Sequence, residues 1–317
     1  RLRALPESFG RLTSLIVLLL QQNQLGALPE SFCRLGALAT LTIYQNQIRR
    51  LPAGLAQLTA LHTLEFNHNR LSGLPEDFGQ FKALHTLQLN QNELSTLPDT
   101  FGQLSNMDVL LLNKNRLASL PDSVGDLSRL HTLWLFEARL MELPDSVGRL
   151  AALRTLDLHH NLLKELPASF GSLKTLHTLD VSLNQLGALP ETFGQLRALR
   201  VLNLGHNRLG RLPENFGQLA DLRRLELGSN QLGALPEAFG ELTALSVLLL
   251  DNNQLMSLPS SFGQLSSLVR LDLGVNQLAA LPWSFCELTR LRELHLGHNQ
   301  LSSLPEGLGR ITGLDVL

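Results

Sequence analysis

The sequence predicts an α/β solenoid, a curved stack of short repeats with a parallel sheet on its concave face and short helical turns on its convex side. The strongest observation is a period of 23 residues, because all 14 prolines, from Pro6 to Pro305, stand at the same place in it. From residue 15 to residue 313 this period runs through 13 repeats with no insertion or deletion. A fixed period of about 20 to 50 residues is typical of solenoids, in which each unit stacks on the next.

Each repeat begins with a predicted strand. We number the positions from the leucine that opens the repeat, such as Leu15 or Leu38. Positions 3 to 7, for example Thr86 to Asn90, alternate outward and inward side chains as a half-buried strand does. Positions 4 and 6 should face the core, and positions 3, 5 and 7 should face solvent. Because every repeat runs in the same direction, neighbouring strands should pair in parallel about 4.8 Å apart.

The other recurrent residues also have predicted structural roles. Asparagine fills position 9 in 12 of the 13 repeats, where its amide can bond backbone groups that leave the sheet. The fixed φ of the proline suits the first position of a short helical turn, and an acidic residue such as Glu30 often follows it. Phenylalanine at position 18 should form a buried stacked ladder. Its members are Phe9, Phe32, Phe78, Phe101, Phe170, Phe193, Phe216, Phe239, Phe262 and Phe285.

The unbroken period predicts a single domain over residues 1–317, although a chain of this length would usually form two domains. Residues 1–14 are the end of an earlier repeat, residues 15–313 are the complete repeats, and residues 314–317 begin another. A solenoid needs polar caps at its ends. We therefore expect the caps to be absent from these residues and to lie outside them, with flanking domains in the full-length protein.

Composition and charge narrow the class of function. Apolar residues make up 44% of the chain and charged residues 17%, which indicates an ordered protein. A net charge of -2 argues against nucleic acid or an anionic membrane as the main partner. No apolar stretch approaches the roughly 18 residues of a membrane-spanning helix, so no membrane insertion is expected.

The two cysteines indicate a cellular compartment. Cys33 and Cys286 both occupy position 19, and they lie 11 repeats apart. That separation is roughly 50 Å along a stack of strands, whereas bridged cysteines lie within about 7 Å of each other. The pair therefore cannot form a disulfide with each other. Unbridged thiols and the lack of an N-x-S/T sequon favour an intracellular, cytoplasmic location, with a secreted or cell-surface bacterial protein as the alternative.

Once the scaffold residues are assigned, the unexplained side chains gather on the predicted concave face at repeat 6. Trp134 and Phe136 lie two apart on one strand, and Ala138 is the single break in the asparagine column. Exposed aromatic residues ringed by polar groups are typical of protein-binding hot spots. The alternative is local drift, in which a wide tryptophan covers a loop that lost its asparagine. The predicted partner-binding residues are Tyr44, Asn90, Leu111, Asn113, Trp134, Phe136, Glu137, Arg139, Asp157 and His159.

A second group of residues on or beside these strands is charged. It could select a charged partner surface. The interpretation we favour is that opposite charges on adjacent strands satisfy one another. The group consists of Asp157, Asp180, Glu226 and Asp272 with Arg200, Arg223, Arg224 and Arg270.

No cofactor, metal site or catalytic centre is predicted. A zinc site needs three or four converging ligands, and among the ten histidines only His62 and His85 share a repeat position in consecutive repeats. The sequence also has no phosphate-binding loop, H-E-x-x-H segment, G-x-S-x-G segment or kinase signature. We therefore expect a protein that is not an enzyme.

The repeated motif L-x-x-L-x-L-x-x-N-x-L-x-x-L-P-x-x-F-G-x-L resembles that of leucine-rich repeat proteins along the whole chain. The strict period is similar to the short-repeat class that includes plant intracellular Ras-group proteins, Scribble-like scaffolds and bacterial members. This resemblance implies a horseshoe-shaped scaffold that binds a protein partner on its concave face, here at repeats 5–7. Two alternatives stay open. One is the substrate-recognition arm of a Roco-type GTPase-kinase or a ubiquitin ligase effector, and the other is a surface adhesion module.

Overall fold

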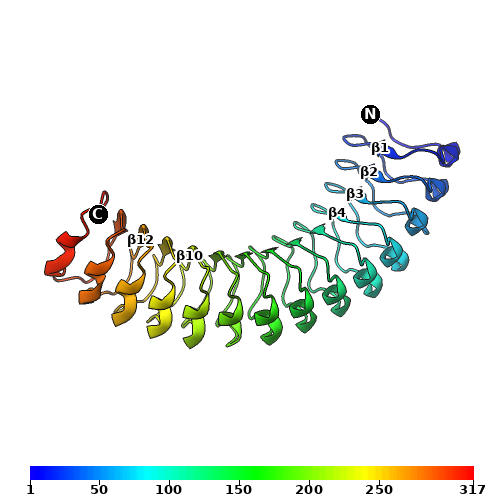
Figure 1. Cartoon of the computed structure of the whole chain (residues 1–317). Helices are drawn as coiled ribbons and strands as arrows, with labels where there is room; N and C mark the ends of the chain where they lie inside the picture. Colours follow the sequence, from blue (N-terminus) through cyan, green and yellow to red (C-terminus); the bar gives the residue numbers. More distant parts are fainter. The chain divides into compact units, whose positions relative to one another are not determined.

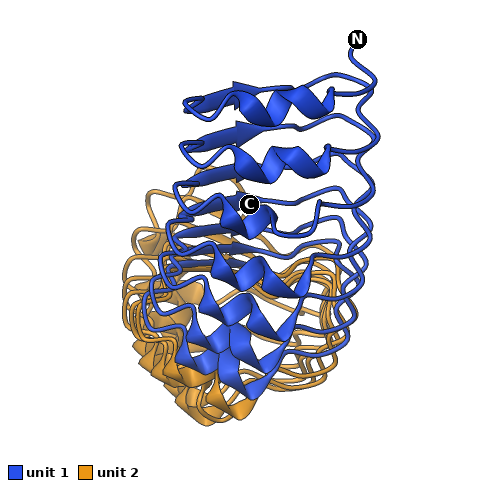
Figure 2. Cartoon of the chain, turned by 90° about the vertical axis from the view of Figure 1, so that its right-hand side faces the viewer, with its two compact units in different colours: residues 1–157 blue, residues 158–317 orange.

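A computed structural model describes residues 1–317 as two compact units, unit 1 of residues 1–157 and unit 2 of residues 158–317 (Figure 2). Each repeat contributes one three-residue strand and one short 3-10 helical turn. Figure 1 shows that within each unit the strands lie on one side and the turns on the opposite side. We call these sides the strand face and the turn face. The predicted class of a repeat solenoid is confirmed, and a single domain over residues 1–317 stays a prediction.

In unit 1 the strands form one parallel sheet in chain order. The register advances by one whole repeat, so Leu41 pairs with both Leu18 and Leu64. Residues at the same repeat position are therefore neighbours. The strands are β1 (Val17–Leu19), β2 (Thr40–Thr42), β3 (Thr63–Glu65), β4 (Thr86–Gln88), β5 (Val109–Leu111), β6 (Thr132–Trp134) and β7 (Thr155–Asp157).

Unit 2 repeats the same arrangement. As in unit 1, its strands cover only positions 3 to 5, two residues fewer than predicted. The hydrogen-bond ladder nevertheless continues past the strand, and Leu204 N–H donates to Glu226 O at 2.8 Å. The strands are β8 (Thr178–Asp180), β9 (Val201–Asn203), β10 (Arg224–Glu226), β11 (Val247–Leu249), β12 (Arg270–Asp272) and β13 (Glu293–His295).

The chain leaves each sheet through a left-handed residue at position 8, which the repeat pattern does not predict. In all 13 repeats this residue is not glycine, and its φ lies between 53° and 58°. Non-glycine residues adopt this region rarely because their Cβ is crowded there. A hydrogen bond to the next repeat offsets the cost, as when Gln22 N–H donates to Tyr44 O at 2.9 Å.

The asparagines at position 9 bond the backbone where the chain leaves the sheet to that of the neighbouring repeat, as predicted. The Asn46 amide donates to Leu20 O at 2.9 Å and to Ile43 O at 3.0 Å, and its Oδ1 accepts from Leu25 N–H at 2.9 Å. Each asparagine thus satisfies backbone groups of two repeats at once. Because buried backbone groups without partners are costly, this position is strongly constrained.

Twelve of the 14 turns begin one residue later than the sequence predicts, and the turns at Leu55–Gln57 and Phe193–Gln195 begin three residues after their prolines. Pro29 has an extended backbone (φ -68°, ψ 152°) and precedes the turn, and its carbonyl accepts from Phe32 N–H at 3.0 Å. The acidic residue after the proline is therefore the first residue of the turn. In unit 1 the turns are η1 (Glu7–Arg11), η2 (Glu30–Arg34), η3 (Leu55–Gln57), η4 (Glu76–Gln80), η5 (Asp99–Gln103), η6 (Asp122–Asp126) and η7 (Asp145–Arg149).

In unit 2 the turns cover an unbroken aromatic ladder. From Phe170 to Phe285 consecutive rings stack with centroids 6.1–6.3 Å apart and planes within 2° of parallel. The predicted ladder is therefore confirmed in this unit. The turns are η8 (Ala168–Ser172), η9 (Phe193–Gln195), η10 (Glu214–Gln218), η11 (Glu237–Glu241), η12 (Ser260–Gln264), η13 (Trp283–Glu287) and η14 (Glu306–Arg310).

Position 19 lies where successive turns touch. A Cβ added at Gly79 would lie 2.0 Å from Thr100 O, which explains why glycine recurs there. Cys33 and Cys286 occupy this position as free, buried thiols. Burial raises the pKa of the Cys33 thiol, and the nearby Glu30 carboxylate adds to the rise. None of the helical turns is long and apolar enough to cross a membrane.

Candidate functional site

The candidate site lies on the strand face of unit 1, at repeat 6. The sheet register places Trp134 of β6 between Leu111 of β5 and Asp157 of β7. Leu133 points the other way and is fully buried, whereas Trp134 is 38% exposed. A large apolar side chain at this place has no core to fill, so its area is open to a ligand.

Trp134 and Phe136 form one aromatic cluster. Their ring centroids are 6.1 Å apart, and the ring planes are tilted by 49°. Side chains two residues apart along an extended segment point to the same face, and such a ring pair contributes about 0.5–1.5 kcal/mol beyond its buried area. Phe136 is half-buried. The pair is therefore held in place before any partner binds.

A charged pair borders this cluster. Lys114 Nζ lies 6.0 Å from the centre of the Phe136 ring and 3.5 Å from the Glu137 carboxylate. Both charged side chains are about 40% exposed, so solvent screens their attraction and the pair contributes little to stability. An aromatic centre with a charged rim is the arrangement expected of a protein-binding surface.

Asn113 adds an unused hydrogen-bond acceptor. The residue is 5% exposed, and its Oδ1 accepts no hydrogen bond. A buried polar atom without a partner costs about 1–3 kcal/mol. Because this oxygen is itself buried, a bound partner does not reach it while the side chain keeps this position.

The structure does not bring all the predicted site residues together. Tyr44 lies two residues after the end of β2, four repeats from Phe136 and so roughly 19 Å away along the sheet. Asn90 lies two repeats from Phe136, at roughly 10 Å. Both are half-buried, and so is His159, which belongs to unit 2. The cluster itself consists of Leu111, Asn113, Trp134, Phe136 and Glu137, with Asp157 beside it.

The missing asparagine at Ala138 changes the backbone next to the cluster. In a regular repeat the asparagine Oδ1 accepts from position 11 of the preceding repeat, so Leu117 N–H lacks this acceptor here. Arg139 takes a left-handed conformation with φ 71°, the only such residue at position 10. Met141 N–H then donates to Ala118 O at 2.9 Å. The predicted site residue Arg139 is exposed at this altered exit.

The charged group is satisfied partly within strands and partly between them. Arg270 of β12 lies 3.4 Å from Glu293 of β13, as expected for pairing across adjacent strands. Arg224 instead bonds Glu226 of its own strand at 2.7 Å. Asp180 accepts hydrogen bonds from Ser182, whose N–H and hydroxyl lie at 2.9 Å and 2.6 Å. Neighbouring side chains and backbone groups therefore pair with much of this charge.

Sequence reasoning missed several exposed residues. Lys114 stood outside the predicted site, and the first strand exposes Val17 and Leu19 by 51% and 59%. Trp283 on the turn face is 75% exposed. A signal for it was present, because Trp283 stands at position 16, where most repeats carry an acidic residue.

Comparisons with known proteins agree with this architecture. A family model described as a leucine-rich repeat region matches residues 122–204 and 139–229. One described as a leucine rich repeat matches residues 59–117, 212–255 and 245–301. A search of curated protein sequences gives no match.

Solved structures show the same relationship. A leucine-rich repeat protein of Leptospira interrogans is 33% identical over 100% of this chain and 88% of its own, with a TM-score of 0.77. The ectodomain of the Arabidopsis thaliana receptor kinase GASSHO1/SCHENGEN3, in complex with CASPARIAN STRIP INTEGRITY FACTOR 2, is 31% identical. That match covers 99% of this chain and 42% of the ectodomain, with a TM-score of 0.72. An internalin, InlF from Listeria monocytogenes, shares the fold at 23% identity, 97% and 88% coverage and a TM-score of 0.78.

Proposed function

This chain belongs to the leucine-rich repeat proteins, and from that premise we propose that it is a non-enzymatic module that binds a protein partner. The binding surface is the strand face centred on repeats 5–7. The observation that carries the proposal is the pair Trp134 and Phe136, two aromatic side chains on a face that needs none for its own core. Tryptophan is among the residues most enriched in binding hot spots.

The surroundings of the pair describe the partner surface that would fit. Leu111 extends the apolar area on the neighbouring strand, and Lys114 with Glu137 supplies charges at the rim. An apolar partner side chain flanked by charged groups therefore matches this surface.

The relatives support a binding role at the level of the family. The Arabidopsis ectodomain was solved in complex with CASPARIAN STRIP INTEGRITY FACTOR 2. By analogy we extend binding of a protein ligand to this chain, while the position of the surface rests on its own residues.

The test is affinity capture with the immobilised chain, read by quantitative mass spectrometry. The double variant Trp134→Ala/Phe136→Ala removes the aromatic pair. The matched control Glu65→Ala/Asn67→Ala changes the same two positions three repeats away on the same strand face. The proteins of interest are those that both the wild type and the control capture. We expect the captured amount of these proteins to be lower by about tenfold or more on the double variant, as loss of a hot spot predicts.

Thermal unfolding of all three proteins separates a binding defect from misfolding. The exposed pair should change the melting temperature little. If the double variant stays folded and still captures the same proteins as the control, the proposed surface is wrong.

The proposed role is compatible with two settings beyond a free-standing module. A GTPase, kinase or catalytic-cysteine domain encoded next to these residues would make the chain the recognition arm of an enzyme. A signal peptide would make it an adhesion module, whereas the free cysteines favour the intracellular setting that we propose. The complete reading frame decides between these settings.

A further inference from the structure

A second exposed tryptophan lies on the turn face of unit 2. Trp283 opens η13 and is the most exposed of the large apolar side chains, at 75%. The aromatic ladder beneath it does not use its ring, because Phe285 of the same turn is the buried member of that ladder. Most repeats carry an acidic residue at this position. The indole therefore has no structural role that the repeat requires.

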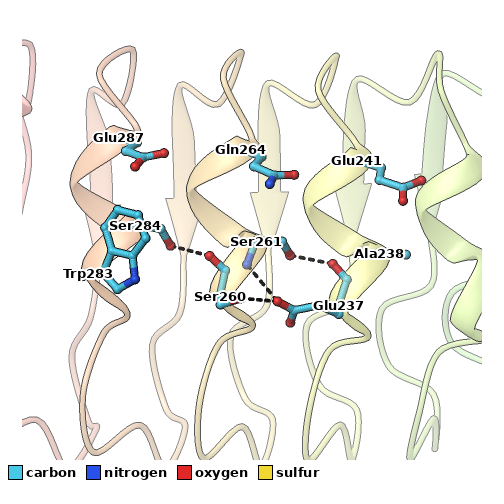
Figure 3. Close-up of a pocket in the computed structure, with 9 residues that line it drawn as sticks. All are labelled: Glu237, Ala238, Glu241, Ser260, Ser261, Gln264, Trp283, Ser284 and Glu287. Atoms are coloured by element: carbon cyan, nitrogen blue, oxygen red, sulfur yellow. Dashed lines mark hydrogen bonds between the residues drawn. The ribbon is translucent and has the colours of Figure 1, made fainter.

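Trp283 borders a hollow of about 650 Å³ that spans three consecutive turns, η11 to η13. Figure 3 shows its lining as two rows. Glu237, Ser260 and Trp283 stand at the starts of the turns, and Glu241, Gln264 and Glu287 stand near their ends.

The hollow carries negative charge only. Three glutamates line it, and no lysine or arginine does. The Glu237 carboxylate is held in place, because its Oε1 accepts from Ser261 N–H at 3.1 Å and from the Ser260 hydroxyl. Ser284 Oγ donates to Ser260 O at 2.7 Å, which joins the second turn to the third (Figure 3). The floor of the hollow is therefore built from turns that are bonded to each other.

We propose that this hollow binds an arginine side chain of a protein partner. Tryptophan is the best aromatic partner for a cation, and a guanidinium stacks on its face within about 6 Å of the ring centre. The turns beneath advance by 6.1–6.3 Å per repeat. The three glutamates stand on the outer two of these turns, Glu287 on one side and Glu237 with Glu241 on the other. A guanidinium above the middle turn is therefore about one repeat from Trp283 on one side and from the turn of Glu237 on the other, within about a Debye length, roughly 8 Å.

Charge complementarity selects this occupant. An arginine places a positive group between carboxylates on the two outer turns and can form charge-assisted hydrogen bonds with those that it reaches. A neutral apolar side chain would cover Trp283 but leave those carboxylates without a counter-charge. This surface uses other residues and the opposite face of the repeat from the Trp134 cluster, so the two proposals stand or fall separately.

The experiment measures the anisotropy of a fluorescein-labelled peptide of alternating glycine and arginine, titrated with the full chain. The probe for charge is the same peptide with citrulline, a neutral analogue of similar shape, in place of arginine. Trp283→Ser is the test variant, since Ser260 already occupies this position in the adjacent turn. Met256→Ser is the matched control, because it removes another exposed apolar side chain of unit 2 that does not line the hollow.

We expect the arginine peptide to bind the wild type and the Met256→Ser variant equally, and to bind Trp283→Ser at least about tenfold more weakly. The citrulline peptide should not bind, and binding of the arginine peptide should weaken as salt is raised. Equal binding of the two peptides, or equal affinity of Trp283→Ser and the wild type, would overturn the proposal. So would self-association of the wild type in sedimentation that Trp283→Ser abolishes, because a second copy would then occupy the hollow.

Discussion

The two tryptophans of this chain occupy opposite faces of their repeats and differ in their surroundings. Trp134 ends a strand, packs against Phe136 and is 38% exposed. Trp283 begins a turn, stands among glutamates and is 75% exposed. The first belongs to an aromatic cluster with a charged rim, and the second is a single ring in an anionic hollow.

This difference shows that exposure alone does not indicate what a surface residue binds. Trp134 has apolar neighbours on its own and the adjacent strand, which favours burial against an apolar partner surface. Trp283 has carboxylates around it, which favours a cation. Four measurements test this comparison: the first asks whether the Trp283 ring is structural, and the other three examine the repeats around Trp134.

The largest expected effect separates the ladder from the ring above it. Phe262→Ala removes a fully buried ring that stacks on two neighbours, and it should lower the free energy of unfolding by about 3–5 kcal/mol. Trp283→Ser on the adjacent turn should change it by less than about 0.5 kcal/mol. Chemical denaturation of the full chain compares the two variants. A loss on Trp283→Ser as large as on Phe262→Ala would mean that the indole is part of the core.

A smaller loss is expected from a regular asparagine. Asn92→Ala leaves Leu71 N–H without its acceptor at 2.9 Å and removes one of the two asparagine donors of Phe66 O and of Leu89 O. Unsatisfied buried groups predict a destabilisation of about 1–3 kcal/mol. Chemical denaturation of the variant and the wild type measures this loss of stability. A loss of stability near zero would show that Ala138 in repeat 6 does not destabilise the protein either. The repeat around Trp134 would then differ less from the regular repeats.

The reverse change at repeat 6 should stabilise the protein. Ala138→Asn offers the acceptor that Leu117 N–H lacks, and we expect a gain of up to about 1 kcal/mol. Hydrogen exchange of the Leu117 amide is the direct measurement, because a new bond slows its exchange. Unchanged exchange at Leu117 would mean that the altered backbone at Arg139 keeps the new asparagine side chain from bonding the Leu117 amide.

The smallest effect concerns the rim of the Trp134 cluster. Lys114 lies 6.0 Å from the Phe136 ring, and an exposed cation–aromatic contact contributes about 0.5–1 kcal/mol. A double-mutant cycle of Lys114→Ala with Phe136→Leu isolates this coupling from the ion pair with Glu137. A coupling energy indistinguishable from zero would leave Lys114 free to bind a partner.

Much of this architecture could be predicted because the repeat is strict. The period predicts parallel strands, and the register confirms them at Leu41, whose neighbours are the leucines one repeat away on each side. Asparagine and phenylalanine have the predicted structural roles because a stack of identical units places equal side chains next to each other. The aromatic pair at positions 134 and 136 was also visible, because strand alternation alone places both residues on one face.

Other features could not be predicted, since they depend on contacts that the repeat pattern does not contain. The left-handed residues at position 8 follow from hydrogen bonds between exits of successive repeats, and residue types as different as Gln22, Glu137 and Val275 adopt them.

The sequence by itself determined the repeat, the parallel pairing and the division of side chains between core and surface, because periodic burial of leucine leaves only one way to stack the units. The tertiary structure decided which surface residues meet. Lys114 lies against Phe136, Asn113 keeps an unbonded acceptor, and Trp283 stands in a hollow of carboxylates, because each of these depends on the side-chain conformations of two or three neighbouring repeats.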